Sequence, residues 1–411
     1  MPTRLTLTHP KSEAHNEGYA RVLSHCYARP VTDSQRWVKR YKPEEILLLV
    51  NPRADGPESV AAGLILLQMG HAFCGSFVRG VGIAGVGVDP EHRGRGTGTL
   101  LMDRTVQHLH RAGVPLSGLY PATQALYRRS GYEQAGHRCA LRMPLTRIGT
   151  HERSLRVRAA TDADTPHIRR LYERHAAASD GMLHRSEALW WRATMVPPSR
   201  EEKARCFVVE SPRHGRGPVP IVGYVSMHMP AGADGKPEVH VMDMVCDSAQ
   251  AGLRLWSFLA SHSTICTDLV WHCTPAHPML MLLAEQSYKL SLFMYWMLRI
   301  IDAPKALAER AYPVATEASL AIELKDPLIR ANNGRFILRV KDGKGSVSKD
   351  ARSTFKGPSI SLAIDTLVPL YSGFMSPHAL RTLDRVTASD ESVAIASSLF
   401  RGQTPAMCEM F

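Results

Sequence analysis

The segment Arg93-Gly94-Arg95-Gly96-Thr97-Gly98 limits the possible folds more than any other part of the sequence. It stands between an apolar stretch at 82–88, which predicts a strand, and a stretch from about Thr97 whose apolar residues recur at helical spacing. Glycines let successive backbone N–H groups turn toward one point, and the first turn of a helix adds unpaired donors. The order strand, loop, helix therefore predicts an anion site that suits a diphosphate.

Two other phosphate-binding patterns do not fit this region. The sequence contains no G-x-x-x-x-G-K-[ST], and no G-x-G-x-x-G stands between an N-terminal strand and a helix. ATP and NAD are therefore weaker candidates for the ligand of the loop.

The elements around the loop predict a mixed α/β domain. Two apolar runs at 44–50 and 60–69 flank a turn-rich segment, which is typical of a hairpin. After the loop and its helix, the patterns predict a strand at 114–121, a short helix at 123–131 and a closing strand at 137–145.

The same order of elements then recurs, which suggests an internal duplication. The second series comprises a strand at 155–158, a helix after it, a hairpin of 206–210 and 220–229 around 211–219, a strand at 239–247, a helix at 251–263, a strand at 267–275, a helix at 277–290 and a strand at 291–302. At 247–253, where the second copy passes from strand to helix, the Arg-Gly-rich loop is missing. The second copy is therefore not expected to hold a diphosphate.

A third domain of α+β type is predicted from about Pro304 onward. It has strands at 319–327 and 334–343, a Gly/Lys/Ser-rich turn, a strand at 358–364 and small helices after it. A chain of 411 residues has room for three domains, and we predict boundaries of 1–148, 149–303 and 304–411.

Composition narrows the environment and the partners. No apolar run is long enough to span a membrane, the N-terminal residues lack the apolar core of a signal peptide, and the eight cysteines form no CxxC pair. We therefore expect a cytoplasmic protein with reduced thiols. A net charge of +12 attracts anions, but no nucleic-acid-binding motif is present, so no nucleic-acid partner is expected. The residues His262, Cys266, His272, Cys273 and His277 do not have the spacing of a zinc site, and no metal is expected.

The residues 86–102, VGVDPEHRGRGTGTLLM, followed by ALYRRSGY at 125–132, resemble the Gcn5-related N-acetyltransferase (GNAT) superfamily. The resemblance implies acetyl-CoA as the acetyl donor. It places the diphosphate on the N–H groups of the loop and pairs the pantetheine arm with the strand before it. The implied cofactor-binding residues are Val86, Gly87, Val88, Arg93, Gly94, Arg95, Gly96, Thr97, Gly98 and Thr99.

Tandem GNAT-like domains followed by a sterol-carrier-like domain resemble the Enhanced intracellular survival (Eis) family along the whole chain. That resemblance implies Tyr127 as general acid and the free carboxylate of Phe411 as general base. Where the family tends to have Ser-Glu before the acid, this chain has Ala122-Thr123, so only backbone contacts to the cofactor are expected there. The family also implies trimers or hexamers, and acceptors such as aminoglycosides, polyamines or lysine side chains.

Acyl transfer to an amine requires both a general acid and a general base. The base removes a proton from the ammonium, and the acid protonates the departing thiolate. A tyrosine, of pKa about 10, suits a thiol of pKa about 8.5, whereas a terminal carboxylate of about 3.5 needs burial or a water relay. The simpler interpretations are that Tyr127 packs in a helix and that Phe411 is a frayed end.

The acceptor side of the predicted site is less defined. Trp37 and Tyr41, near the end of an N-terminal helix, and Glu409 beside the C-terminus are the candidate substrate residues. The alternative function is an acyl-CoA- or lipid-binding protein without acetyltransferase turnover.

Overall fold

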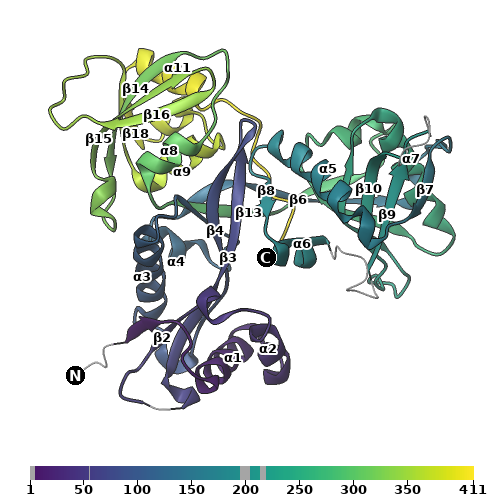
Figure 1. Cartoon of the computed structure of the whole chain (residues 1–411), viewed down its shortest axis with the longest axis horizontal. Coiled ribbons are helices and arrows are strands. Elements are labelled where there is room, and N and C mark those ends of the chain that lie inside the picture. The colour runs from purple at the N-terminus through teal and green to yellow at the C-terminus, as the bar shows by residue number, and fades with distance from the viewer. Residues whose placement is uncertain (1–4, 55, 195–203, 213–218) are drawn as a thin grey trace. The chain divides into compact units, whose positions relative to one another are not determined.

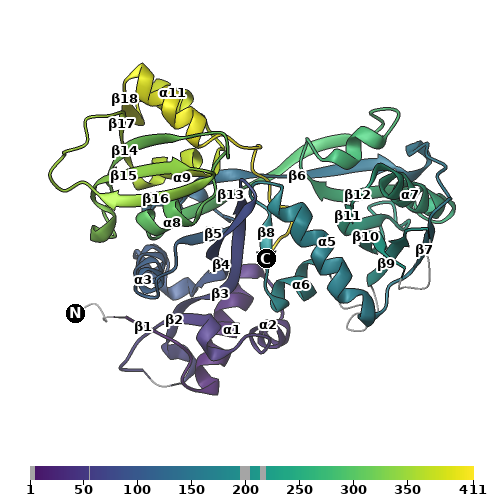
Figure 2. The same cartoon turned by 45° about the horizontal axis from the view of Figure 1, so that its top comes forward.

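The structure is a computed structural model that describes residues 5–54, 56–194, 204–212 and 219–411. The chain divides into two compact units (Figures 1 and 2). The first unit comprises residues 1–71, 76–135 and 296–402, and the second comprises 72–75, 136–295 and 403–411. We call the parts the N-terminal domain and the C-terminal domain, both in the first unit, and the middle domain, in the second.

The N-terminal domain is a sheet with helices on both faces. Its elements are β1 (Thr6–Thr8), α1 (Glu13–Tyr27), α2 (Val31–Val38), β2 (Ile46–Val50), β3 (Val60–Phe73), β4 (Ser76–Val88), α3 (Thr97–Arg111), β5 (Leu116–Leu119) and α4 (Gln124–Arg129). The strand order is β1-β2-β3-β4-β5. Antiparallel pairing of β2 with β3 confirms the predicted first hairpin.

Successive side chains of the strands point alternately to the two helical layers, one on each face of the sheet. Leu47 and Leu49 of β2 pack in one apolar cluster with Leu101 and Met102 of α3. Between them Leu48 lies on the opposite face, the one covered by α1, because successive strand side chains point to opposite sides. Figures 1 and 2 show α3 on one side of these strands and α1 with α2 on the other.

β4 and β5 run parallel and then part. Their pairing begins at Gly80 opposite Leu116 and ends at Ile83 opposite Leu119, where β5 stops. β4 continues to Val88. Among the described residues, the last residues of β4 therefore pair with no strand on their β5 side.

The middle domain repeats this plan. Its elements are β7 (Arg156–Ala159), α5 (Thr165–Ala177), β8 (Leu183–Arg185), α6 (Glu187–Thr194), β9 (Ala204–Glu210), β10 (Ile221–His228), β11 (Val239–Cys246), α7 (Ala249–Ala260) and β12 (Asp268–Cys273). β9 and β10 are antiparallel, and β11 and β12 are parallel with α7 between them, as β4 and β5 are around α3. Of the turn predicted at 211–219, residues 213–218 lie outside the described residues.

The two copies exchange their last strands. β6 (Glu133–Pro144), predicted at 137–145 to close the first domain, pairs instead with β12 of the second unit. β13 (Lys289–Ile300), at the end of the second copy in sequence, pairs through Met297–Ile300 with β5. Two strands of similar alternation can fill either position, so the sequence pattern did not distinguish the place beside β5 from the place beside β12.

The helix predicted at 277–290 is wrong. Only one turn of 3-10 helix forms, at Pro278–Leu282, and Leu283 is already extended. The indole Nε1 of Trp256 donates a 2.9 Å hydrogen bond to the Met279 carbonyl. That carbonyl is the one an α-helix would offer to Leu283, so packing against Trp256 ends the helix.

The C-terminal domain is a five-stranded sheet with small helices. Its elements are α8 (Ala303–Glu309), β14 (Ala318–Lys325), β15 (Gly334–Lys341), β16 (Lys344–Lys349), β17 (Ser359–Ala363), α9 (Ile364–Ser372), α10 (Pro377–Thr382), β18 (Val386–Ala388) and α11 (Asp390–Leu399). The strand order is β16-β15-β14-β17-β18. β16 lies in the segment predicted as a turn. It is an edge strand with no buried side chain, and such a strand needs no apolar pattern.

Candidate active site

The predicted diphosphate loop joins β4 to α3 in the N-terminal domain (Figure 1). Gly94 and Gly96 have φ angles of 71° and 78°, the left-handed region that glycine adopts without strain. A Cβ added at either position would meet no atom within 4 Å. The glycines therefore serve the backbone conformation, and the space beside them is open to a ligand.

The first turn of α3 keeps its backbone donors available. Gly96 occupies the N-cap position and has no side chain to cap the helix. The first bond within the helix runs from the Leu100 N–H to the Gly96 carbonyl, at 2.9 Å. The N–H groups of Thr97, Gly98 and Thr99 precede that bond and have no acceptor in the helix. Together with the helix dipole, they make a cradle that fits a diphosphate.

Side chains around the loop hold its shape. The Thr97 hydroxyl donates to the His92 carbonyl at 2.8 Å, and the Arg93 Nε donates to the Val88 carbonyl at 3.2 Å. Arg93 and Arg95 are both exposed, so they add positive charge where a diphosphate would lie. Gly98 contributes differently, because its Cβ would lie 3.3 Å from Leu126 of α4. A glycine there lets α4 approach the start of α3.

The free part of β4 lies next to this loop. Val86, Gly87 and Val88, the residues expected to pair with the pantetheine arm, all lie beyond Ile83, where β5 stops. The strand is distorted at Gly85, which has a φ of 60° and whose carbonyl accepts a 2.7 Å hydrogen bond from the Tyr19 hydroxyl. An unpaired, irregular strand edge is the kind of backbone that an extended ligand can pair with.

Two of the predicted substrate residues lie beside that distortion. A Cβ at Gly85 would fall 2.5 Å from the Trp37 indole, so the indole packs directly on the strand. The Trp37 and Tyr41 rings make an edge-to-face contact at 5.1 Å, and Tyr41 is buried. The structure thus places Trp37 against the predicted pantetheine strand and Tyr41 against Trp37, and their contact with an acceptor stays a prediction.

Tyr127 lies in α4, which approaches the predicted diphosphate loop at Gly98. Its side chain is 4% exposed, and it makes an edge-to-face contact with Tyr132 at 6.2 Å. Burial, with a smaller effect of nearby Tyr27, raises the pKa of Tyr127 above its usual value. The hydroxyl therefore remains protonated, as a general acid must be before the reaction. Ala122 and Thr123 are exposed just before α4, and Thr123 makes no capping hydrogen bond with its side chain.

α4 is held in place from the C-terminal domain. Arg299 of β13 is fully buried, donates its Nε to the Ser130 carbonyl at the end of α4, and binds both oxygens of Asp326 at 2.8 and 2.9 Å. At the surface, Arg128 binds Glu133 at 2.8 Å, and Glu133 also pairs with Arg385. The position of Tyr127 therefore depends on contacts with the third domain.

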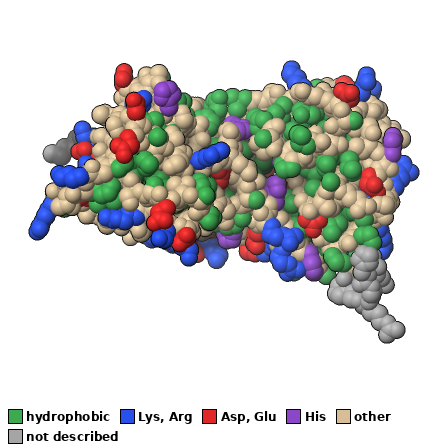
Figure 3. All heavy atoms as spheres, turned by 90° about the horizontal axis from the view of Figure 1, so that it is seen from above, with side chains coloured by type: hydrophobic (Ala, Val, Ile, Leu, Met, Phe, Trp, Pro, Cys, Tyr) green, Lys and Arg blue, Asp and Glu red, His purple; other side chains and the backbone are tan. Residues whose placement is uncertain are grey.

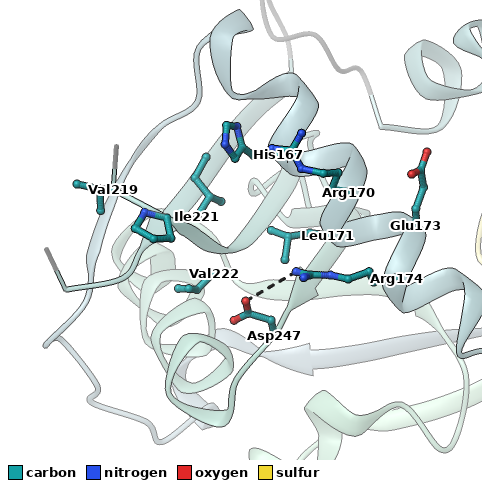
Figure 4. Close-up of a pocket in the computed structure, with 10 residues that line it drawn as sticks. His167, Arg170, Leu171, Glu173, Arg174, Val219, Ile221, Val222 and Asp247 are labelled. Carbon is teal, nitrogen blue, oxygen red and sulfur yellow. Dashed lines mark ion pairs between the residues drawn. The ribbon is translucent and has the colours of Figure 1, made fainter. Parts of the chain in front are cut away.

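The corresponding place in the middle domain differs. Between β11 and α7 stand only Asp247 and Ser248, and the Ser248 hydroxyl caps the helix by accepting the Ala251 N–H at 3.2 Å. A hollow of about 540 Å³ lies nearby, between α5 and the start of β10 (Figure 4). Its exposed Arg174 reaches across to Asp247 at 3.9 Å. The start of α7 is therefore capped, and no glycine stands in the two-residue connection before it.

The predicted base and one predicted substrate residue belong to the second unit. Phe411 is half-buried at the end of the segment 403–411. Glu409 is buried, and its carboxylate binds Arg185 and the Tyr172 hydroxyl. The catalytic role of Phe411 and the substrate role of Glu409 stay predictions.

The histidine- and cysteine-rich stretch at 262–277 forms part of the middle domain. His272 and Cys273 lie on opposite faces of β12, and the His277 Nδ1 accepts the Met279 N–H at 3.2 Å. Within the described ranges, no group of three His, Cys, Asp or Glu side chains is arranged to hold a metal ion.

Three family models match the chain in succession. Two describe an acetyltransferase (GNAT) domain, at residues 9–135 and 181–300, and the third describes a sterol carrier protein domain, at 303–408. The fold is therefore mixed α/β, with tandem GNAT domains followed by a sterol-carrier-like domain. The predicted boundaries 1–148, 149–303 and 304–411 stay predictions, and the structure groups residues 403–411 with the middle domain.

Whole-chain relatives identify the family. The GCN5-related N-acetyltransferase of Anabaena variabilis is 30% identical, with a TM-score of 0.89 over 99% of this chain and 100% of that one. A protein of Streptomyces griseus described as an uncharacterized N-acetyltransferase is 28% identical over 82% of this chain and 83% of its own length. These relatives and the paired domains define an enzyme class, the N-acetyltransferases. Within it, the chain belongs to the GCN5-related N-acetyltransferase family.

The architecture is also that of Eis proteins. Eis1 from Mycobacterium abscessus is 21% identical, with a TM-score of 0.75 over 99% of this chain and 100% of that one. At this identity the likeness concerns the fold, which is Eis-like along the whole chain.

Sequence reasoning missed some residues around the site. Cys26 of α1 lies 3.4 Å from the Val88 carbonyl and within 3.4 Å of an Arg93 guanidinium nitrogen. Tyr19 and Gly85 shape the strand beside it. The one available signal was the run of glycines in the strand GVGIAGVGV, since a glycine within a strand often marks a bulge or a close approach.

Proposed function

We propose that this N-acetyltransferase transfers an acetyl group from acetyl-CoA to a primary amine of a small molecule or of a lysine side chain. The observation that carries the proposal is the uncapped, glycine-lined start of α3 next to the unpaired end of β4. The first fits a diphosphate, and the second fits the extended pantetheine arm. A GNAT fold with this cradle supports an acyl-CoA donor, and acetyl is the acyl group we propose.

Bound acetyl-CoA supplies the acyl thioester. The N–H groups from Gly94 to Thr99 hold its diphosphate, and the backbone of Val86 to Val88 orients the arm that carries the thioester. The Phe411 carboxylate accepts one proton from the acceptor ammonium, and the neutral amine then forms a C–N bond to the acetyl carbon as the C–S bond breaks. Tyr127 protonates the departing thiolate, and the second proton lost from the nitrogen restores the Tyr127 hydroxyl. Burial raises the pKa of Tyr127, so the proton stays on the hydroxyl until the thiolate leaves. This supports the role of Tyr127 as general acid.

Charge bears on the choice of acceptor. The chain carries a formal charge of +12, which repels a polycationic amine at long range. On the face drawn in Figure 3, lysine and arginine side chains are interspersed with acidic and apolar ones rather than gathered together. Screening beyond about 8–10 Å leaves local charges to decide binding. Aminoglycosides, polyamines and lysine peptides therefore form the acceptor panel.

The test measures free thiol release from acetyl-CoA with an aminoglycoside, spermidine and a lysine peptide, together with the mass of the acetylated product. We expect turnover with at least one amine. Tyr127→Phe should lower kcat by about 100-fold, the usual share of a general acid. The matched control is Tyr312→Phe in the C-terminal domain, which removes a hydroxyl that donates to Leu307 at 2.6 Å and should leave kcat within threefold.

The same assay distinguishes the proposed transferase from the alternative function. A protein that binds acyl-CoA or lipid without turnover would release no thiol above background with any amine, while lipids would raise its melting temperature. That outcome would remove the transferase proposal.

Assembly and location are further proposals: the Eis-like architecture supports a trimer or hexamer, and scattered cysteines without a disulfide framework support the cytoplasm. We infer a trimer or hexamer in the cytoplasm, and light scattering after size-exclusion chromatography tests the assembly. In the part of the chain that the structure describes, no helix has both the length and the apolar character needed to cross a bilayer.

A further inference from the structure

The C-terminal segment, defined as residues 403–411, is fixed to the middle domain along its length. The Gln403 and Ala406 N–H groups both donate to Asp180, to its carboxylate and its carbonyl respectively, at 2.9 Å. The Met407 N–H donates to the His137 carbonyl at 3.2 Å. In these contacts the backbone N–H groups of the segment donate, and Ala406 forms an isolated parallel β-bridge with His137. They stop at Met407.

Beyond Met407 the attachment is made by charged side chains. The Arg138 Nε donates to the Cys408 carbonyl at 2.9 Å. The Glu409 Oε1 accepts from the Arg185 Nε at 2.7 Å and from the Tyr172 hydroxyl at 2.6 Å. Only Met410, half of whose surface is exposed, separates this anchor from Phe411.

Arg185 itself cannot shift to follow the segment. Its Nη1 binds Asp243 at 2.7 Å, and its side chain is 1% exposed. The guanidinium carbon lies 3.4 Å from the centre of the Tyr172 ring and 4.7 Å from that of Trp190. A guanidinium held by a carboxylate and stacked on two rings provides a rigid receptor for a second carboxylate.

The middle domain does not need Glu409 for its own charge balance. Arg185 and Asp243 already form a neutral buried pair. Glu409 adds a second negative charge, and its Oε2 has no hydrogen-bond partner among the described residues. Burying an extra carboxylate is unfavourable, so a purely stabilising role does not explain why the C-terminal segment brings one here.

We propose that Glu409 and Arg185 are positioning residues that hold the Phe411 carboxylate in place for proton transfer. This inference rests on the proposed function, in which that carboxylate is the base. It gives the middle domain, which lacks a diphosphate loop, a part in the reaction: it holds the end of the chain.

The first test is Glu409→Gln, which keeps the shape of the side chain and removes its charge. We expect kcat to fall at least tenfold and the KM for acetyl-CoA to change less than twofold, because the cofactor loop lies in the other unit. Amide hydrogen exchange should become faster in residues 403–411 and stay unchanged in β11. The matched control is Glu285→Gln, which makes the same charge change at an exposed position of the same unit and should alter none of these values.

A double-mutant cycle separates positioning from mere stabilisation. Deleting Phe411 should lower kcat, and adding Glu409→Gln to the deletion should then lower it no further, since both changes remove the same group from its place. If Glu409→Gln lowers kcat equally with and without Phe411, or leaves it unchanged in the full chain, the positioning inference is wrong. If deleting Phe411 leaves kcat unchanged, the carboxylate is not the base and the proposed function fails at that point.

A milder variant guards against loss of folding. Tyr172→Phe removes one donor to Glu409 and keeps the ring that stacks on Arg185. We expect a fall in kcat of about threefold, in line with the loss of one of several hydrogen bonds. The exchange of residues 403–411 should quicken in proportion, and an unchanged kcat with quickened exchange contradicts the inference.

Discussion

The N-terminal and middle domains are two copies of one fold that treat the start of the same helix in opposite ways. In the N-terminal domain, the loop from Asp89 to Gly96 leads into α3, and the N-cap glycine leaves the helix donors without a side-chain acceptor. In the middle domain, Ser248 stands at that place and caps α7 with its own hydroxyl. An uncapped helix start after a glycine-rich loop is suited to an anion, whereas the serine cap of α7 makes an ordinary helix start.

The comparison teaches that the copy without the glycine-rich loop still holds a distant part of the chain. The middle domain retains the α/β frame, and it binds the chain's own C-terminal segment through Arg185. The N-terminal domain in turn receives β13 from the second copy, and with it the buried Arg299. Each copy therefore depends on a segment from elsewhere in the chain, held by a buried arginine.

Replacing Arg299, the buried arginine of the exchanged strand β13, should have the largest effect on stability. Arg299→Met leaves Asp326 buried without its cation, and the loss of one partner of such a pair costs about 3–5 kcal/mol. Chemical denaturation should show this loss, and turnover of the remaining folded protein should fall because the Ser130 carbonyl loses its bond. The control, Arg381→Met, breaks a pair with the exposed Asp390 and should cost less than about 1 kcal/mol.

Closing the open loop should have the next largest effect. Gly96→Val places a β-branched residue at a φ of 78°, which costs on the order of 1–3 kcal/mol, and its side chain enters the open space. We expect the KM for acetyl-CoA to rise by about 10- to 100-fold, with a smaller change in kcat. Gly235→Val, at a φ of 81° and also in open space, repeats the strain in the middle domain. An equal rise in KM for both variants would contradict the cofactor role of the loop.

The loop and the fold around it follow from the sequence because their signals are local. Glycines after an apolar strand and before a periodic helix predict the cradle, and the helix does begin at Thr97. The strand exchange does not follow in this way, because 137–145 and 291–302 have similar patterns and tertiary packing decides which of them pairs with β5 and which with β12.

Other features depended on partners far apart in sequence. Glu409 was expected near the acceptor, and nothing local reveals that Arg185 and Tyr172 bind it. β16 was missed because an edge strand with exposed faces carries no apolar signal. The helix predicted at 277–290 was wrong because Trp256 takes a carbonyl that the helix requires.

Lowering the pH should destabilise the middle domain through His277, a residue for which the N-terminal domain has no counterpart in this comparison. Burial, with a smaller effect of His175, lowers the pKa of His277 to about 3. Between that value and the about 6.5 of an exposed imidazole, the unfolded chain binds a proton that the folded chain does not. Stability is therefore complete above pH 6.5 and falls as the pH drops, by at most about 1.4 kcal/mol per pH unit.

Urea unfolding at pH 7.5 and 5.5, followed by hydrogen exchange in each unit, measures this effect. His277→Asn keeps an acceptor for the Met279 N–H and removes the titrating group, so it should reduce the pH dependence. His167→Asn, at an exposed position in the same domain, should not. An equal dependence in all three proteins would assign the acid sensitivity to other groups.

The smallest expected difference concerns the aspartate that follows the equivalent strand in each copy. Asp89 has a side chain that is 5% exposed, accepts the Glu91 N–H at 3.1 Å and pairs with Arg21 at 3.3 Å. Asp247 is 36% exposed, and its Arg174 partner, at 3.9 Å, is 70% exposed. Asp89→Ala removes a buried hydrogen-bond acceptor at the base of the cofactor loop and should cost about 1–2 kcal/mol. Asp247→Ala breaks a solvated pair and should cost less than about 0.5 kcal/mol.

Asp89→Ala should also raise the KM for acetyl-CoA, because the loop begins there, whereas Asp247→Ala should leave it unchanged. Equal costs for the two variants would mean that the loop adds no constraint to the aspartate at its start.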